Sequence, residues 1–193
     1  QYTLASIQLF DSMGIPWCAY FAELNWLPEI VAQMVNCNQV FNFTRGERRG
    51  WNELFYPAEG HGIEEEYIKP ILKNLRQTAT LICRPNKDAF CCSKSIQALE
   101  KLNHAGTLSW IRHFENQVNE TGVPLIQSLR RANMYWYEMK TDNMADFVAN
   151  INYDKSLFIA MLQERSFIDQ RLIGLSLKGE YQNENKLLFL ALL

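Results

Sequence analysis

Short strand-like and helix-like segments follow one another along this 193-residue chain without a regular β-α-β alternation. Runs with strand composition or alternation are 39–44, 52–56, 78–84, 89–92, 147–151, 157–161 and 171–177. Helical spacing is found in 27–37, 63–75, 94–103, 106–118, 125–132 and from Asn185 onward. This order argues against a doubly wound nucleotide fold. It predicts an α+β fold of mixed, mostly antiparallel short strands packed with several helices.

Proline and turn residues refine three of these segments. Pro28 suits the first turn of the helix expected at 27–37. The segment 63–75 opens with three glutamates and ends near Lys73 and Arg76, the charge order that favours a helix dipole, and Pro70 should kink this helix. The turn-forming residues 85–88 predict a hairpin that joins 78–84 to 89–92.

Composition excludes several classes of protein. The formal charge of −2 argues against a uniformly basic nucleic-acid binder, so any DNA-binding surface must be a local patch. The five cysteines lack the Cys-x-x-Cys spacing of zinc sites, which favours a reduced, cytoplasmic protein. The sequence has neither a signal-peptide pattern nor an apolar run of membrane-spanning length, so we expect no membrane partner.

Both ends of the sequence suggest a piece of a larger protein. The chain begins without an initiator methionine and stops within the apolar run 187–193. We expect residues 1–38 to be a helical lead-in from a preceding domain. Residues 39–193 would then form one domain, cut within its last helix.

A basic loop bracketed by glycines lies between the first two expected strands. Its arginines can reach phosphates or the guanine edge, its glycines allow the backbone to approach a duplex closely, and the following asparagine can pair with adenine. The alternative is a solvated hairpin tip whose glycines only supply turn angles. The candidate DNA-binding residues here are Arg45, Gly46, Arg48, Arg49, Gly50 and Asn52.

The sequence around this loop, FTRGERRGWNELF at 43–55, resembles a signature of adenine-N6 DNA methyltransferases of type II restriction-modification systems. That signature opens their target-recognition region and reads arginine-glycine, three residues, glycine-x-asparagine, then phenylalanine. EEEYIKPILK at 64–73 is similar to the acidic segment and lysine-proline step that follow in the family. Weaker similarities are WYEM at 136–139, SFIDQR at 166–171 and the last helix at 185–193.

The resemblance, which spans roughly residues 40–193 with gaps, implies sequence-specific recognition of double-stranded DNA. The family's methyl-donor loop and its catalytic asparagine-proline-proline motif are both absent, and the sequence contains no Pro-Pro pair. The resemblance therefore implies no catalytic residue, metal or cofactor in this chain. S-adenosylmethionine and adenine flipping would belong to a catalytic domain of the same polypeptide, which in some family members also carries a nuclease.

Other basic residues are further DNA-binding candidates. Arg130 and Arg131 precede the aromatic run 135–137 and Lys140, a mixture typical of DNA-facing surfaces. Arg84 and Lys87 lie at the predicted hairpin turn, although charged turns are more often simply solvated. The helical pair 112–113 is a similar candidate. For Trp51 and Phe55 we expect packing in the core rather than base stacking.

Two other functions remain open. The slightly acidic net charge and the apolar C-terminal run would also suit a protein-interaction or regulatory domain with no nucleic-acid role. His61 with Glu64 and Glu65 has a spacing that can share one helix face, which would suit a metal-dependent hydrolase. Against the metal site, three consecutive glutamates are also explained by electrostatics at a helix start.

Overall fold

The structure, a computed structural model, describes residues 13–14, 26–47, 49–75, 80–151 and 158–193. The chain divides into two units, Gln1–Val40 and Phe41–Leu193. The described part of the first unit contains α3 (Leu27–Val31) and α4 (Cys37–Val40), neither of which buries a side chain. Pro28 lies in the first turn of α3, as expected.

The single helix expected at 27–37 is wrong because the chain leaves the helix after α3. The backbone amide of Asn38 donates to the Asn36 side chain over 2.9 Å. Such a local side-chain bond offers the backbone an alternative to helical pairing, and α4 starts one residue after Asn36.

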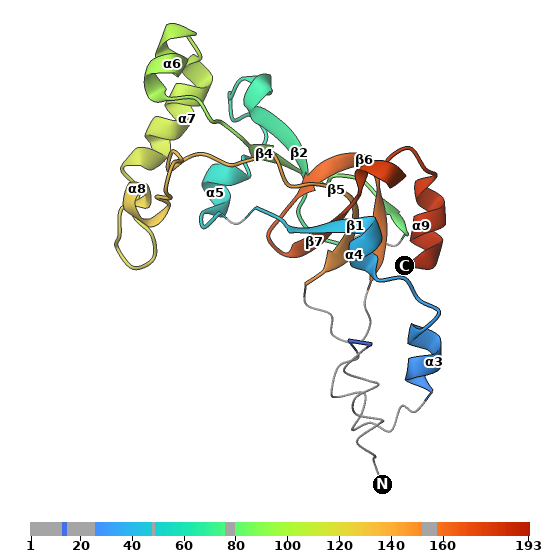
Figure 1. The fold of residues 1–193 in the computed structure, drawn as a ribbon. Coiled ribbons are helices and arrows are strands. Elements are labelled where there is room, and N and C mark those ends of the chain that lie inside the picture. Colours follow the sequence, from blue (N-terminus) through green and yellow to red (C-terminus); the bar gives the residue numbers. More distant parts are fainter. Residues whose placement is uncertain (1–12, 15–25, 48, 76–79, 152–157) are drawn as a thin grey trace. The chain divides into compact units, whose positions relative to one another are not determined.

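A seven-stranded sheet forms the centre of the second unit (Figure 1). Its main path runs β1-β7-β5-β6-β2-β4, and β3 also pairs with β6. Pairings of β2 and β3 with β6 are parallel, and the other pairings are antiparallel. The strands are β1 (Phe41–Arg45), β2 (Ile68–Leu72), β3 (Ile82–Cys83), β4 (Lys87–Phe90), β5 (Met144–Asn150), β6 (Ile159–Ile168) and β7 (Leu172–Leu177).

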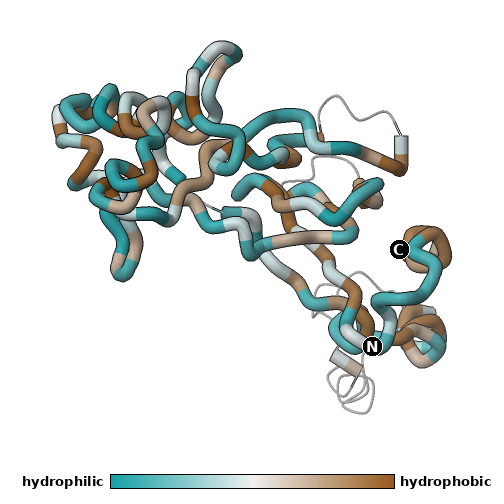
Figure 2. The backbone as a smooth tube through the Cα atoms, turned by 90° about the horizontal axis from the view of Figure 1, so that it is seen from above, coloured by the Kyte–Doolittle hydropathy of each residue, from teal (hydrophilic) through white to brown (hydrophobic). Residues whose placement is uncertain are grey.

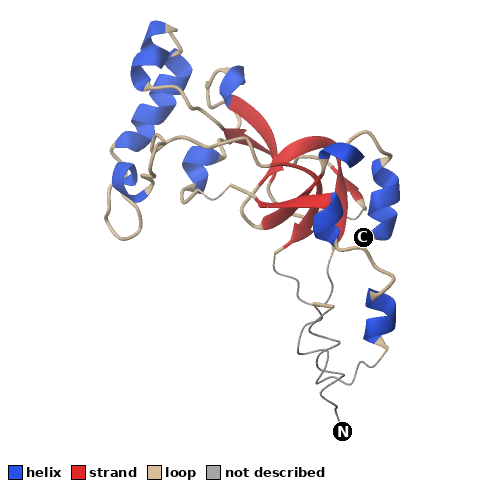
Figure 3. Cartoon of the chain, viewed as in Figure 1, coloured by secondary structure: helices blue, strands red, loops and turns tan. Residues whose placement is uncertain are grey.

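Short helices complete this unit (Figure 3). The expected α+β class, with mostly antiparallel strands and several helices, is thereby confirmed. The helices predicted at 94–103, 106–118, 125–132 and from Asn185 are present in shorter form. The helical elements are α5 (Asn52–Phe55), η1 (Glu65–Tyr67), α6 (Ile96–Lys101), α7 (Ala105–Glu115), α8 (Leu125–Ser128), η2 (Gly179–Tyr181) and α9 (Lys186–Leu192).

The helix predicted at 63–75 is wrong, because this segment forms η1 followed by strand β2. Pro70 fits within β2 because the pairing with β6 covers only Ile71 and Leu72, so the missing amide hydrogen interrupts no bond to β6. The glutamates have partners elsewhere: Glu64 hydrogen-bonds α7, and Glu66 pairs with Lys94.

The strand predicted at 52–56 is also wrong, because its first four residues form the single turn α5. Leu54 and Phe55 are fully buried there, and the indole nitrogen of Trp110 donates to the carbonyl of Leu54 over 3.1 Å. Burial of two consecutive residues does not suit a strand with one solvent-facing side. Core packing of Phe55 is confirmed, and Trp51 packs partly buried against the same cluster.

The hairpin predicted between 78–84 and 89–92 does not form. Instead, β3 pairs with β6 and β4 pairs with β2; residues 78–79 lie outside the described residues. Asn86, directly before β4, connects this turn to the residues after β2. Its side chain accepts from the amide of Lys73 at 2.9 Å and donates to the carbonyl of Asn74 at 2.8 Å.

The C-terminal helix α9 is attached to the sheet by an ion pair and an aromatic contact. Lys186 lies 2.6 Å from the buried carboxylate of Asp146, and the Phe189 ring meets Phe41 edge-on at 6.0 Å. Figure 2 shows this helix as mainly apolar. Leucines on its other side are exposed to solvent: Leu187, Leu188 and Leu192.

Candidate nucleic-acid interface

The basic loop after β1 is held against the turn between β6 and β7. The amide of Gly46 donates to the carbonyl of Leu172, and that of Glu47 to the carbonyl of Ile168, both over 3.2 Å. A Cβ atom on Gly46 would overlap the backbone carbonyl of Asp169. Position 46 therefore requires glycine because the backbone of Asp169 lies so close to it. This reason differs from the one expected from the sequence, which was close approach of the backbone to a DNA duplex.

Asp169 organises this turn from a buried position. Its carboxylate accepts a hydrogen bond from the Tyr56 hydroxyl and, over 3.0 Å, one from the backbone amide of Arg171. Burial and the bond to Asp169 raise the pKa of Tyr56 above its ordinary value. The ammonium of Lys73 lies 4.1 Å from the centre of the Tyr56 ring. Tyr56, after α5, and the β6–β7 turn are thus connected into one support.

An open groove of about 760 Å³ lies beside this support. Three arginines and four amide side chains contribute to it, and among the described residues that line it there is no carboxylate. We call it the arginine groove. Its lining comprises Arg45, Arg49, Gly50, Asn52, Asn74, Leu75, Asn150, Ile151, Gln170, Arg171 and Leu172.

Arg49 is the buried member of the arginine groove, with 6% of its surface exposed. Its Nη2 donates to the carbonyl of Trp136 over 2.5 Å, and its guanidinium lies 4.6 Å from the centre of the Phe55 ring. Nε and Nη1 are buried, and no atom of the described residues accepts a hydrogen bond from them. Burial, followed by the charge of Arg131, lowers the pKa of Arg49 to about 10.

The other loop candidates differ in setting. Arg45 and Asn52 are exposed in the groove, and the Nε of Arg45 donates to the carbonyl of Gln170 over 3.2 Å. Gly50 is also exposed, and a Cβ there would lie 3.3 Å from Leu129. Arg48 lies outside the described residues. The structure therefore brings together Arg45, Arg49, Gly50 and Asn52 from the predicted loop.

Arg130 and Arg131 line a second open cavity, of about 810 Å³, together with Asn133, Tyr135 and Glu138 among others. Arg131 also forms a 2.7 Å ion pair with Glu47 of the basic loop. Because Glu47 directly follows Gly46, this ion pair connects the second cavity to the loop that carries the arginine groove.

The remaining candidates do not line either of these two cavities. Arg84, the residue directly after β3, is exposed and donates to the side chain of Gln163, and Lys87 is exposed at the start of β4. Lys140 lines a third cavity, of about 620 Å³, in which lysines and carboxylates are mixed.

Arg171 lines the arginine groove but was not among the residues predicted from the sequence. Its only signal was its place at the end of the weak similarity at 166–171.

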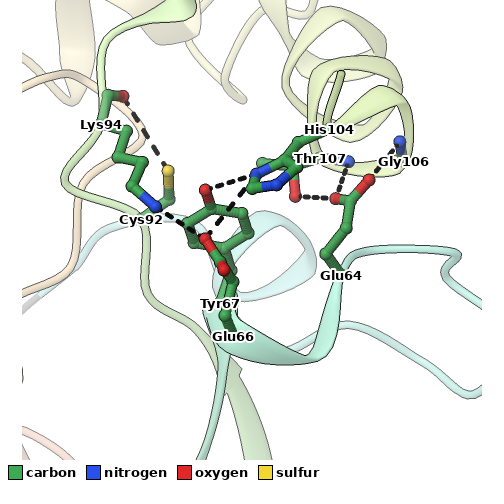
Figure 4. A network of polar contacts seen from close by, with 8 residues as sticks. All are labelled: Glu64, Glu66, Tyr67, Cys92, Lys94, His104, Gly106 and Thr107. Atoms are coloured by element: carbon green, nitrogen blue, oxygen red, sulfur yellow. Dashed lines mark hydrogen bonds and ion pairs between the residues drawn. The ribbon is translucent and has the colours of Figure 1, made fainter. Parts of the chain in front are cut away.

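A polar network fixes α7 relative to η1 (Figure 4). The carboxylate of Glu64 accepts from the amides of Gly106 at 2.9 Å and Thr107 at 2.8 Å, and from the Thr107 hydroxyl. Burial tends to raise the pKa of Glu64, but these hydrogen bonds, led by that of the Thr107 side chain, lower it to about 2. Beside it, the Tyr67 hydroxyl lies 2.7 Å from Nδ1 of His104.

The alternative of a metal site at His61, Glu64 and Glu65 is not supported by this arrangement. Both Glu64 oxygens face α7, and Nδ1 of His61 accepts the amide of Ile63 over 2.9 Å. Within the described ranges, no group of three or more histidine, cysteine, aspartate or glutamate side chains is placed to hold a metal ion.

No protein-family model matches this sequence, and no curated protein shows significant similarity to it. In the part of the chain that the structure describes, no helix combines the length and apolar character required to cross a membrane.

Proposed function

We propose that this chain is the sequence-specific DNA recognition module of an adenine-N6 DNA methyltransferase or of a combined restriction-modification enzyme. The arginine groove is the observation that supports this function best. It combines three arginines with four amide side chains, and its described lining contains no carboxylate. Arginine and amide side chains are the types that contact DNA phosphates and base edges.

A local concentration of positive charge is compatible with the slightly negative net charge of the whole chain. A net charge of −2 does not favour general attraction to DNA, but a groove lined by three guanidinium groups is a local positive patch. The exposed Arg45, Asn52 and Arg171 would make the direct contacts. Arg130 and Arg131 would extend the contact surface along the second cavity.

In this proposal the chain finds and holds the site while another domain performs the chemistry. The sequence carries neither the methyl-donor loop nor the catalytic motif of the family it resembles. A catalytic domain of the same polypeptide would bind S-adenosylmethionine, flip the adenine and methylate its N6. The cytoplasm, where the DNA of a bacterial host lies, would be the site of action.

A protein-interaction role is the second candidate, and one observation favours it. Leu187, Leu188 and Leu192 are exposed on α9, with Leu192 at 83% of its full surface. Exposed apolar groups on one helix are typical of a contact surface. A docked catalytic domain would cover them equally well, so this feature is compatible with both functions.

The test is fluorescence anisotropy with a random duplex pool at low and at moderate salt. The double variant Arg45→Gln/Arg171→Gln removes two exposed guanidinium groups from the groove. A matched control, Lys101→Gln/Arg165→Gln, removes the same charge from exposed positions that do not line it. We expect salt-sensitive binding that falls at least tenfold in the groove variant and stays within twofold in the control.

Two results would contradict the proposal. One is no binding by the wild-type chain at low salt. The other is an equal loss in both double variants, because general charge rather than the groove would then explain the affinity. Selection of a preferred sequence from the bound pool would separate specific recognition from phosphate contacts alone.

A further inference from the structure

Two of the three guanidinium nitrogens of Arg49 have no hydrogen-bond acceptor among the described residues. A guanidinium group has five N–H donors, and in Arg49 the Nη2 group donates to the carbonyl of Trp136. Nε and Nη1 are buried and have no acceptor among the described residues. Among the described residues, no carboxylate lies within ion-pair distance of Arg49. Buried cations are normally paired, so this arrangement is costly unless an anion joins it.

The two carboxylates whose charges act on Arg49 already have other partners. Glu47 is paired with Arg131, and Glu138 accepts a hydrogen bond from the backbone amide of Tyr135 over 3.0 Å. Neither belongs to the groove lining. The described side chains that line the groove therefore do not neutralise its positive charge.

Two further guanidinium groups surround the same space. Arg45 and Arg171 are exposed, and both line the groove with Arg49. The Nε of Arg45 is directed to the carbonyl of Gln170, the residue directly before Arg171, so both arginines are attached to one turn. Three cations in one groove repel one another, and a single anion with several oxygens would reverse the sign of that interaction.

We propose that the arginine groove is a binding site for a phosphate group, with Arg49 as its buried cation and Arg45 and Arg171 as its exposed cations. A phosphate carries a full charge and offers several acceptor oxygens, whereas a base edge offers only partial charges. The buried guanidinium lacks a partner that carries a full negative charge, and a phosphate would supply one. Arg49 would therefore position the duplex rather than read a base.

The source of the phosphate is either the DNA backbone or a free phosphate compound. In assigning a backbone phosphodiester to the groove, the inference rests on the proposed function. The phosphate site itself does not depend on it, since inorganic phosphate would occupy the same cations. An experiment with separate arms for the two sources distinguishes failure of the site from failure of DNA recognition.

The Nε–H resonance of Arg49 is the direct reporter, measured by nitrogen-15 NMR on the whole chain and assigned by its loss in Arg49→Lys. One arm adds inorganic phosphate, with sodium chloride at equal ionic strength as the control. The other adds a short duplex in phosphate-free buffer. Arg45→Gln/Arg171→Gln keeps the buried reporter and removes the exposed cations, and Lys101→Gln/Arg165→Gln is the matched control.

We expect saturable shifts of the Arg49 resonance with phosphate and with duplex, but not with chloride. The apparent phosphate affinity should fall at least fivefold in Arg45→Gln/Arg171→Gln and stay within twofold in the control pair. A response to phosphate alone would support the site and assign it to a free phosphate compound. A response to duplex alone would support a backbone phosphodiester. An unresponsive resonance in both arms would overturn the site, even if anisotropy showed that the chain binds DNA.

Discussion

The Tyr56 hydroxyl donates a hydrogen bond to the buried carboxylate of Asp169, 113 positions later in the sequence. The bond connects the residue after α5 with the turn between β6 and β7. Both segments border the arginine groove, because Asn52 and Arg171 line it. Groove shape and the stability of the sheet therefore depend on the same contact.

Tyr56→Phe should lower the free energy of unfolding by about 1–3 kcal/mol, because it leaves one oxygen of a buried carboxylate without its donor. The measurement is urea unfolding followed by circular dichroism. Tyr135→Phe is the control, since Tyr135 is 41% exposed. An equal effect of both substitutions would argue against a structural role for the bond to Asp169.

Gly46→Ala should be more harmful than Gly50→Ala. A Cβ at position 46 overlaps the backbone carbonyl of Asp169, whereas one at position 50 meets only a flexible leucine side chain at 3.3 Å. We expect a loss of about 2–3 kcal/mol at position 46 and less than about 1 kcal/mol at position 50. Thermal unfolding of the two variants, measured side by side, checks the difference. If Gly46→Ala were as stable as the wild type, β1 and the β6–β7 turn would have to be able to separate.

Arg49→Met should separate stability from binding. Replacement of an unpaired buried cation by an apolar side chain of similar length is often neutral or stabilising, so the free energy of unfolding should change by less than about 1 kcal/mol. DNA affinity should nevertheless fall at least tenfold. Urea unfolding and anisotropy on the same preparation give both values. A large loss of stability would indicate that the bond to Trp136 is the main role of Arg49.

Glu64→Gln should have a pH-dependent effect. The pKa of Glu64 is lowered to about 2 in the folded chain, from an ordinary value of 4.5, so its carboxylate stabilises the fold fully above about pH 4.5. That contribution is lost as the pH falls through the folded pKa. We expect a cost of about 1 kcal/mol at pH 7, typical of a lost helix cap, and a smaller one at pH 3.

Urea unfolding of both proteins at the two pH values tests this dependence. Glu65→Gln is the control, because Glu65 is exposed. A difference between wild type and Glu64→Gln that grew toward pH 3 would contradict the sign, and would place the stabilising role of Glu64 in its protonated form.

Sequence patterns predicted the elements whose signal is local. Helical spacing located α7 and α9, and β-rich composition located β7. The patterns failed where distant partners decide the conformation. Residues 68–72 form a strand because they pair with β4 and β6, and the charged centre of β6 concealed its full length.

The candidate site shows the same division. A glycine-bracketed basic loop is visible in the sequence, and Arg45, Arg49 and Asn52 do line one groove. The sequence could not show that Arg49 is buried, because that depends on Phe55 and Trp136. Nor could it select Arg171, whose position depends on the turn that Asp169 supports.

The pairing of the first strand of the second unit with the last has a consequence for folding during synthesis. Phe41–Arg45 pairs with Leu172–Leu177, so β1 has to wait for more than a hundred further residues to leave the ribosome before this pairing can form. Contacts at such separation close slowly. The helices α6 and α7, built from local contacts, can form first. The basic loop, although early in the sequence, is therefore among the last parts of the unit to acquire its final shape.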